Sequence, residues 1–156
     1  MKRTFLLFAA LFLTTFFVSA QTPNRQNNDL APGSPQLMQP EELAKVIQST
    51  TGQKPVVLYV GPRTFYVQAH ISGAEYIGPT SKPDGLDKLR ARAKSLARES
   101  VVVIYCGCCP WEHCPNIRPA YAELEKMGFQ KLRVLYLTNS FGTNWVDKGY
   151  PVAKGE

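Results

Sequence analysis

The most constraining feature of this chain is an uninterrupted apolar run, Val101–Tyr105, followed at once by four cysteines within nine residues. A strand without polar alternation is buried on both faces, which is typical of a parallel sheet covered by helices. The cysteines are Cys106, Cys108, Cys109 and Cys114, and a helical pattern begins just after them. Because unpaired N–H groups at a helix start stabilise a thiolate, this position predicts sulfur chemistry.

Strand and helix patterns alternate along the rest of the chain. Apolar runs bounded by Gly and Pro indicate strands, and apolar residues at helical spacing indicate helices. The expected strands are 55–60, 74–77, 101–105 and 132–137, and the expected helices are 40–47, 65–70, 86–98 and 117–127. This order predicts an α/β fold with a single domain, in which a mostly parallel central sheet carries helices on both faces.

The N-terminus has the pattern of a secretory signal peptide. A basic start and an apolar run, 5–18, precede small residues suited to cleavage after Ala20. The expected segments are a signal peptide at 1–20, a flexible polar linker at 21–37, the folded domain at 38–153 and a C-terminal tail at 154–156. We therefore expect an exported protein, periplasmic if bacterial and otherwise secreted, with no stable membrane insertion after cleavage.

The formal net charge of +6 is modest, and much of it lies on the helix expected at 86–98. There, Lys and Arg alternate with Leu and Ala in the pattern of an amphipathic helix with a solvated basic face. The pattern speaks against nucleic acid as a partner of an exported domain. The same positive field favours small anions such as thiosulfate.

The clustering of the cysteines matters more than their even number. In exported domains an even number usually indicates structural disulfides. These four are too close in sequence to cross-link distant parts of the fold, and a bridge between them closes only a small ring. The cluster therefore favours a reactive or metal-binding role.

Four other residues near the cysteines are candidates for the same site. Asn116 is expected to cap the helix that follows. Arg118, in the first turn, adds positive charge if its side chain points back to the loop, and the alternative is a surface arginine. His113 is a candidate base or metal ligand, with plain solvent exposure as the alternative. Trp111 is a candidate to shield the loop or to bind an acceptor, and the alternative is plain packing of the longer loop.

The sequence resembles the rhodanese-like domain family from Met38 to Val152. The segment His70-Ile-Ser-Gly-Ala74 is similar to the family's His-Ile-Pro-Gly-Ala, and 101–106 resembles the strand that leads into its catalytic cysteine. The family's C-terminal pattern is matched by Gly128-Phe129, Trp145 and Gly149-Tyr-Pro-Val152. The resemblance implies the rhodanese-like fold, a structural His70 and a core Trp145.

The resemblance also implies a sulfurtransferase mechanism. Cys106 would take sulfane sulfur from a donor as a persulfide and pass it to a thiophilic acceptor, without a cofactor. The donor would be a small sulfur-containing anion or a thiol, and a protein thiol is a further possible partner. The loop assigned to hold the persulfide comprises Gly107, Cys108, Cys109, Trp111, His113 and Asn116.

The chain departs from the family at its active loop. The loop is about five residues longer, and Tyr59-Val60-Gly61 replaces the Asp-x-Arg usual after the first strand. A phosphatase loop of the Cys-x5-Arg type is excluded, because Glu112 stands where the arginine would bind phosphate.

The extra cysteines leave two alternatives to sulfur transfer open. One is thiol–disulfide or persulfide exchange, in which Cys106 attacks and Cys108, Cys109 or Cys114 resolves; Cys114 is the expected partner. The other is a Cu(I) or Zn(II) site. Its candidate ligands are Cys106, Cys108, Cys109, Cys114 and His113, whose spacing matches no standard zinc ribbon.

Overall fold

The computed structural model describes residues 30–155. The predicted signal peptide, 1–20, and the first part of the predicted linker lie outside this range. Within the described range, no helix has both the length and the apolar character needed to span a bilayer.

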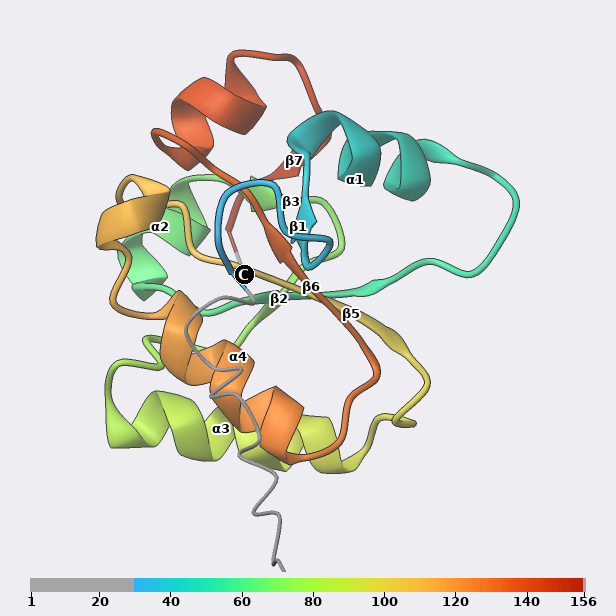
Figure 1. Ribbon diagram of the computed structural model, residues 1–156. Coiled ribbons are helices and arrows are strands. Elements are labelled where there is room, and N and C mark those ends of the chain that lie inside the picture. Colours follow the sequence, from blue (N-terminus) through green and yellow to red (C-terminus); the bar gives the residue numbers. More distant parts are fainter. Residues whose placement is uncertain (1–29, 156) are drawn as a thin grey trace, which may run out of the picture.

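A parallel sheet of five strands forms the centre of the domain (Figure 1), in the order β1-β6-β5-β2-β4. These strands are β1 (Leu37–Met38), β2 (Val56–Tyr59), β4 (Glu75–Tyr76), β5 (Val101–Tyr105) and β6 (Lys131–Leu135). Strand β5 lies in the middle and pairs in parallel with both β2 and β6. A separate antiparallel pair joins β3 (His70–Ile71) to β7 (Val152–Ala153). The predicted α/β class with a mostly parallel central sheet is confirmed.

Helices cover both faces of the sheet, as predicted. Figure 1 shows α3 (Pro83–Lys94) and α4 (Ile117–Lys126) together on one side and α1 (Pro40–Gln48) on the other. The short helix α2 (Arg63–Gln68) and the π-helical turn η3 (Gly142–Val146) supply Tyr66 and Trp145 to the core on the α1 side.

Strand β5 contributes to both cores in alternation. Val102 and Ile104 pack with the α3–α4 side, and Val103 and Tyr105 pack with the α1 side. All four side chains are fully excluded from solvent. The absence of polar residues in this strand thus reflects burial on two faces.

Local sequence explains where the helices begin and end. Helices α1 and α3 both carry Pro in the first turn with an acidic residue beside it. Helix α4 ends before Gly128, whose φ of 86° is in the left-handed region. Its N–H donates to the Glu125 carbonyl, and the Phe129 N–H donates to the Leu124 carbonyl. Helix α3 runs 83–94, earlier than the expected 86–98, because Pro83 starts it.

The folded domain reaches further toward the N-terminus than the predicted boundary at residue 38. Leu30 and Leu37 are buried, and Leu37 pairs with Val134 at the edge of the sheet. The end of the predicted flexible linker therefore packs on the domain. The polar composition of 21–37 concealed these two leucines, and a two-residue strand has no periodicity to detect.

Candidate active site

Cys106 is the first residue after the central strand, at the carboxyl end of β5, and only 2% of its surface is exposed. In parallel sheets this edge is where binding sites form. The next residue, Gly107, has a φ of 75°, and its carbonyl accepts the N–H of Phe141. A Cβ on Gly107 would lie 2.6 Å from the Phe141 Cβ, so the turn requires glycine for both conformation and space.

Gly61, just past the end of β2, makes room for the Cys106 thiol. A Cβ there would lie 2.8 Å from the Cys106 Sγ and 2.7 Å from the Tyr59 hydroxyl. In the sequence, Gly61 is recognisable only as the end of a strand and as a departure from the family motif. Its closeness to a residue 45 positions away is a tertiary contact that no local pattern reveals.

Three of the four cysteine sulfurs gather at this edge. The Sγ atoms of Cys106, Cys108 and Cys114 all lie within 4.8 Å of one another, and we call this group the sulfur triad. The Cys106 and Cys108 sulfurs are 3.1 Å apart, and the Cys109 sulfur lies 3.5 Å from Cys108 but outside the triad. All four cysteines are free thiols. The structure therefore brings together the predicted nucleophile and its predicted partner.

Asn116 takes part in the site in a way that differs from its predicted role as a helix cap. Its side chain makes no capping hydrogen bond. Instead, its Nδ2 donates to the Cys106 sulfur at 3.4 Å, and its Oδ1 accepts the Ser81 N–H at 3.1 Å. The Thr80 hydroxyl donates to the Asn116 carbonyl. The buried amide thus ties the thiol to the segment that precedes α3.

The start of α4 faces Cys114 rather than Cys106. A hydrogen bond from Cys106, together with the backbone N–H groups of Asn116 and Ile117, lowers the pKa of Cys114 to about 6. The hydrogen bonds of the Cys106 thiol to Cys108 and Cys114, reinforced by burial, raise the pKa of Cys106. Within the triad, the start of α4 thus favours negative charge on Cys114, and burial disfavours it on Cys106.

Cys108 and Cys109 are neighbours in sequence, but their pKa values are shifted in opposite directions. The hydrogen bond with Cys106 lowers the pKa of Cys108 to about 7. Burial and the hydrogen bond with Cys108 raise the pKa of Cys109 to about 12. Only one of the two adjacent thiols is thus a thiolate near neutral pH.

The triad opens onto a pocket of about 280 Å³, which we call the thiol pocket. Its lining residues are Tyr59, Phe65, Gln68, Ala69, Cys106, Gly107, Cys108, Ser140, Phe141, Gly142 and Val146. Within the described chain, none of the lining residues is a lysine, an arginine or a carboxylate. Phe65 and Val146, at 48% and 37% exposed, are among the large apolar side chains that face solvent.

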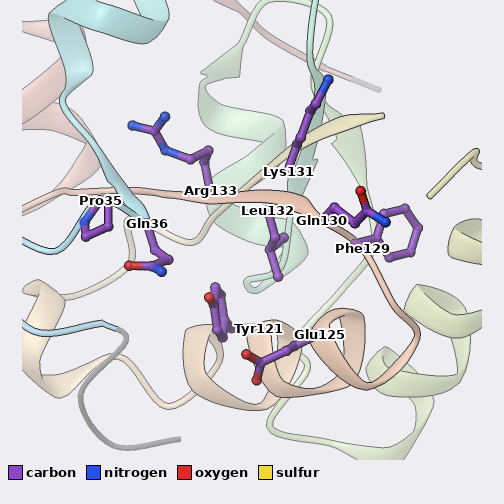
Figure 2. A pocket seen from close by; sticks show the side chains of 9 residues that line it. All are labelled: Pro35, Gln36, Tyr121, Glu125, Phe129, Gln130, Lys131, Leu132 and Arg133. Atoms are coloured by element: carbon purple, nitrogen blue, oxygen red, sulfur yellow. The ribbon is translucent and has the colours of Figure 1, made fainter. Parts of the chain in front are cut away.

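A larger cavity of about 430 Å³ lies elsewhere, against α4 and the amino-terminal half of β6. Figure 2 shows Tyr121 pointing from α4 toward Leu132 of β6, with Glu125 farther along the helix and Gln36 to one side. Its described lining contains neither cysteine nor histidine.

The other residues assigned to the loop do not join the triad. His113 and Arg118 are exposed, on the 3-10 turn η2 (Trp111–His113) and on the first turn of α4. Trp111 is buried and packs edge-on against Tyr136. With Cys106 and Cys114 it borders a space of about 10 Å³ behind the triad. Its burial and its contact with Tyr136 are those of the packing alternative.

His70 and Trp145, the two residues expected to be structural, are both buried and hydrogen-bonded to the backbone. His70 is buried, its Nδ1 lies 2.8 Å from the Tyr66 carbonyl, and its ring stacks on Tyr66. Trp145 is fully buried, and its indole N–H donates to the Pro151 carbonyl.

Comparison with known proteins gives matches in structure alone. No protein-family model and no curated protein matches the sequence. The crystal structure of the Alr3790 protein from Anabaena sp. superposes with a TM-score of 0.57 and 19% identity, covering 76% of this chain and 92% of that one. The solution structure of the rhodanese-like domain of Alr3790 superposes with a TM-score of 0.55 and 20% identity, covering 76% of this chain and 79% of that one. The BH2092 protein from Bacillus halodurans gives 0.55 and 21% identity, covering 75% of each chain.

These likenesses show that the chain has the rhodanese-like fold, as its sequence motifs predicted. Residues 30–155 form a single α/β domain with this fold. A cysteine-rich loop occupies the edge of its sheet at the carboxyl end of β5.

Proposed function

We propose that this protein is a rhodanese-type sulfurtransferase that carries sulfane sulfur as a persulfide on Cys106. The observation that supports this most is the position of Cys106. It lies at the carboxyl end of the central strand, lines the thiol pocket, and has two N–H donors on its sulfur. These donors are the Asn116 amide and the Cys108 backbone. Both would stabilise the negative charge of a persulfide.

The transfer is balanced without an external oxidant or reductant. The Cys106 sulfur attacks the outer sulfur of a donor persulfide, R–S–SH. A new S–S bond forms to Cys106, the S–S bond of the donor breaks, and the departing R–S⁻ takes up the proton that Cys106 loses. An acceptor thiol then attacks the outer sulfur of the Cys106 persulfide and leaves with it, which restores the Cys106 thiol.

The pocket favours a thiol-bound donor over thiosulfate. A dianion needs positive charge close to the reacting sulfur, and the described lining of the thiol pocket contains no cation. Arg118, expected to add positive charge if it points back to the loop, is exposed and does not line the pocket. The exposed Phe65 and Val146 at the pocket suit an apolar group attached to the donor thiol. We propose a persulfide carried by an organic or protein thiol as the substrate.

Mass spectrometry of reduced, metal-free protein tests the assignment. The protein is incubated with a low-molecular-weight persulfide or with thiosulfate, and the loop peptide is examined for one added sulfur. We expect the addition on Cys106, faster from the persulfide than from thiosulfate. Cys106→Ser should abolish it, whereas Cys109→Ser, outside the triad, should retain it. Equal labelling of Cys106→Ser would overturn the assignment.

The closeness of Cys106 and Cys108 favours a second candidate, thiol–disulfide exchange. With their sulfurs 3.1 Å apart, Cys108 can attack the inner sulfur of a Cys106 persulfide. This forms a Cys106–Cys108 disulfide and expels the outer sulfur as hydrogen sulfide, so two thiols are oxidised and the sulfane sulfur is reduced. Release of hydrogen sulfide with loss of two titratable thiols would identify this path, and a stable persulfide with no sulfide release would exclude it.

A further inference from the structure

We infer that the sulfur triad is a three-coordinate binding site for Cu(I). The inference concerns metal binding rather than sulfur transfer and stands whether or not the proposed activity is found. It concerns Cys106, Cys108 and Cys114, which come from a single loop and meet at the carboxyl end of β5.

The distances between the sulfurs suit a small metal ion. A metal in the plane of three thiolates at about 2.3 Å from each sulfur holds the sulfurs about 4.0 Å apart. The three Sγ atoms already lie within 4.8 Å of one another, with the shortest pair at 3.1 Å. Side-chain movements of less than about 1 Å therefore complete the site.

The number and type of ligands distinguish Cu(I) from Zn(II). In the part of the chain that the structure describes, no histidine or carboxylate joins the three sulfurs. His113, the predicted nitrogen ligand, is exposed, and Cys109 lies outside the group. Structural zinc is almost always held by four ligands in a tetrahedron. Three soft thiolates within one group, with Cys109 beside Cys108 but outside it, suit the soft cation Cu(I) in three-coordination.

The surroundings of the triad are those of a ligand group held in place. The Asn116 amide donates to the Cys106 sulfur at 3.4 Å. The Oδ1 of the same amide accepts the Ser81 N–H at 3.1 Å, which holds the amide in place. Such outer contacts orient metal ligands and disperse their negative charge. Trp111 and Ile117 close the space behind Cys106 and Cys114. Cys108 lines the thiol pocket, so the triad is open from that side.

Metal and persulfide compete for the same thiol. Cu(I) on Cys106 occupies the sulfur that the proposed transfer needs, so a loaded protein should form no persulfide. The two properties are therefore measured separately, with persulfide formation tested in metal-free protein.

The experiment is a Cu(I) titration of the reduced full-length protein under anaerobic conditions, in competition with the coloured chelator bicinchoninate. We expect one Cu(I) per chain, and copper X-ray absorption should show sulfur neighbours only, three in number. Ser substitution of Cys106, Cys108 or Cys114 should each weaken binding by more than about a hundredfold. Asn116→Leu should weaken it about tenfold. A parallel Zn(II) titration should give binding at least about tenfold weaker.

Cys109→Ser and His113→Ala are the matched controls, and both should bind Cu(I) as the natural chain does. Circular dichroism of every variant separates loss of the site from loss of the fold. Failure of Cu(I) to compete with the chelator would overturn the inference, as would a nitrogen neighbour or equal loss in Cys109→Ser. Preference for Zn(II) would also overturn it. Persulfide formation without Cu(I) binding would contradict this inference alone, and Cu(I) binding without persulfide would contradict the proposed function alone.

Discussion

The thiol pocket and the larger cavity beside α4 differ in more than size. The larger one, about 430 Å³, lies at the amino-terminal half of β6 and has a described lining without cysteine or histidine. The thiol pocket, about 280 Å³, lies at the carboxyl end of β5 and contains two members of the sulfur triad. In this fold the direction of the strands, rather than the volume of a cavity, determines where the cysteines gather.

The largest effect on stability is expected in the larger cavity, from Leu132→Ala. Leu132 is a buried core residue of β6, and its truncation should lower the free energy of unfolding by about 2–5 kcal/mol. Persulfide formation per folded molecule should be unchanged. Urea unfolding and mass spectrometry measure the two quantities. Exposed Glu125, changed to Gln, should shift stability by less than about 0.5 kcal/mol. If fully folded Leu132→Ala formed less persulfide than the natural chain, the larger cavity would not be independent of the thiol pocket.

Gly61→Ala should lower both the stability of the domain and the rate of persulfide formation. The new Cβ would lie 2.8 Å from the Cys106 sulfur and 2.7 Å from the Tyr59 hydroxyl, and both side chains are buried. We expect a loss of about 1–3 kcal/mol in unfolding free energy together with slower persulfide formation. Gly142→Ala is the control, because its Cβ would meet only the Ser140 hydroxyl at 3.6 Å in the same pocket. Equal behaviour of the two variants would show that Cys106 has more room than the structure gives it.

Asn116→Asp should separate the two hydrogen bonds of this side chain. A carboxylate can still accept the Ser81 N–H, but it offers no donor to the Cys106 sulfur and repels an anion there. We expect about 1–2 kcal/mol of destabilisation and persulfide formation slowed about tenfold. Asn144→Asp makes the same change where the side chain accepts two backbone N–H groups, and it should load sulfur normally. If Asn116→Asp formed the persulfide at the normal rate, the Asn116 amide would have no role in sulfur loading.

The smallest effect is a difference in the pH dependence of alkylation between two neighbouring thiols of the unmutated protein. A lowered pKa of about 7 makes Cys108 mostly thiolate above neutrality, and a raised pKa of about 12 keeps Cys109 protonated there. At pH 8, iodoacetamide should therefore alkylate Cys108 before Cys109. The Cys108 rate should fall as the pH drops through 7, whereas the Cys109 rate should still rise above pH 10. Peptide mass spectrometry follows both sites, and coincident profiles would contradict the assigned environments.

The sequence predicted the framework of the site because the relevant signals are local. The unbroken apolar run of β5 indicates a central strand, and Cys106 follows it directly. The signal for the end of α4 is also local, because Gly128 marks it. These features need no knowledge of what packs against them.

The rest depends on contacts between distant segments. Gly61 and Asn116 matter because of what lies beside Cys106 in space, and neither residue type signals this alone. His113 and Arg118 face solvent because of how η2 and α4 sit on the sheet, which spacing within the loop does not determine. The strands β1, β3 and β7 have two residues each, too few to show alternation.

Strand β1 has a consequence for the solubility of the domain. It pairs with the outer side of β6, through Leu37 and Met38, and β4 is equally short at the opposite edge. Two-residue strands at both margins offer few free N–H and C=O groups to another chain, which is how natural sheets avoid joining edge to edge. A protease that removed the segment before residue 39 would uncover β6 and turn a closed margin into a template for aggregation.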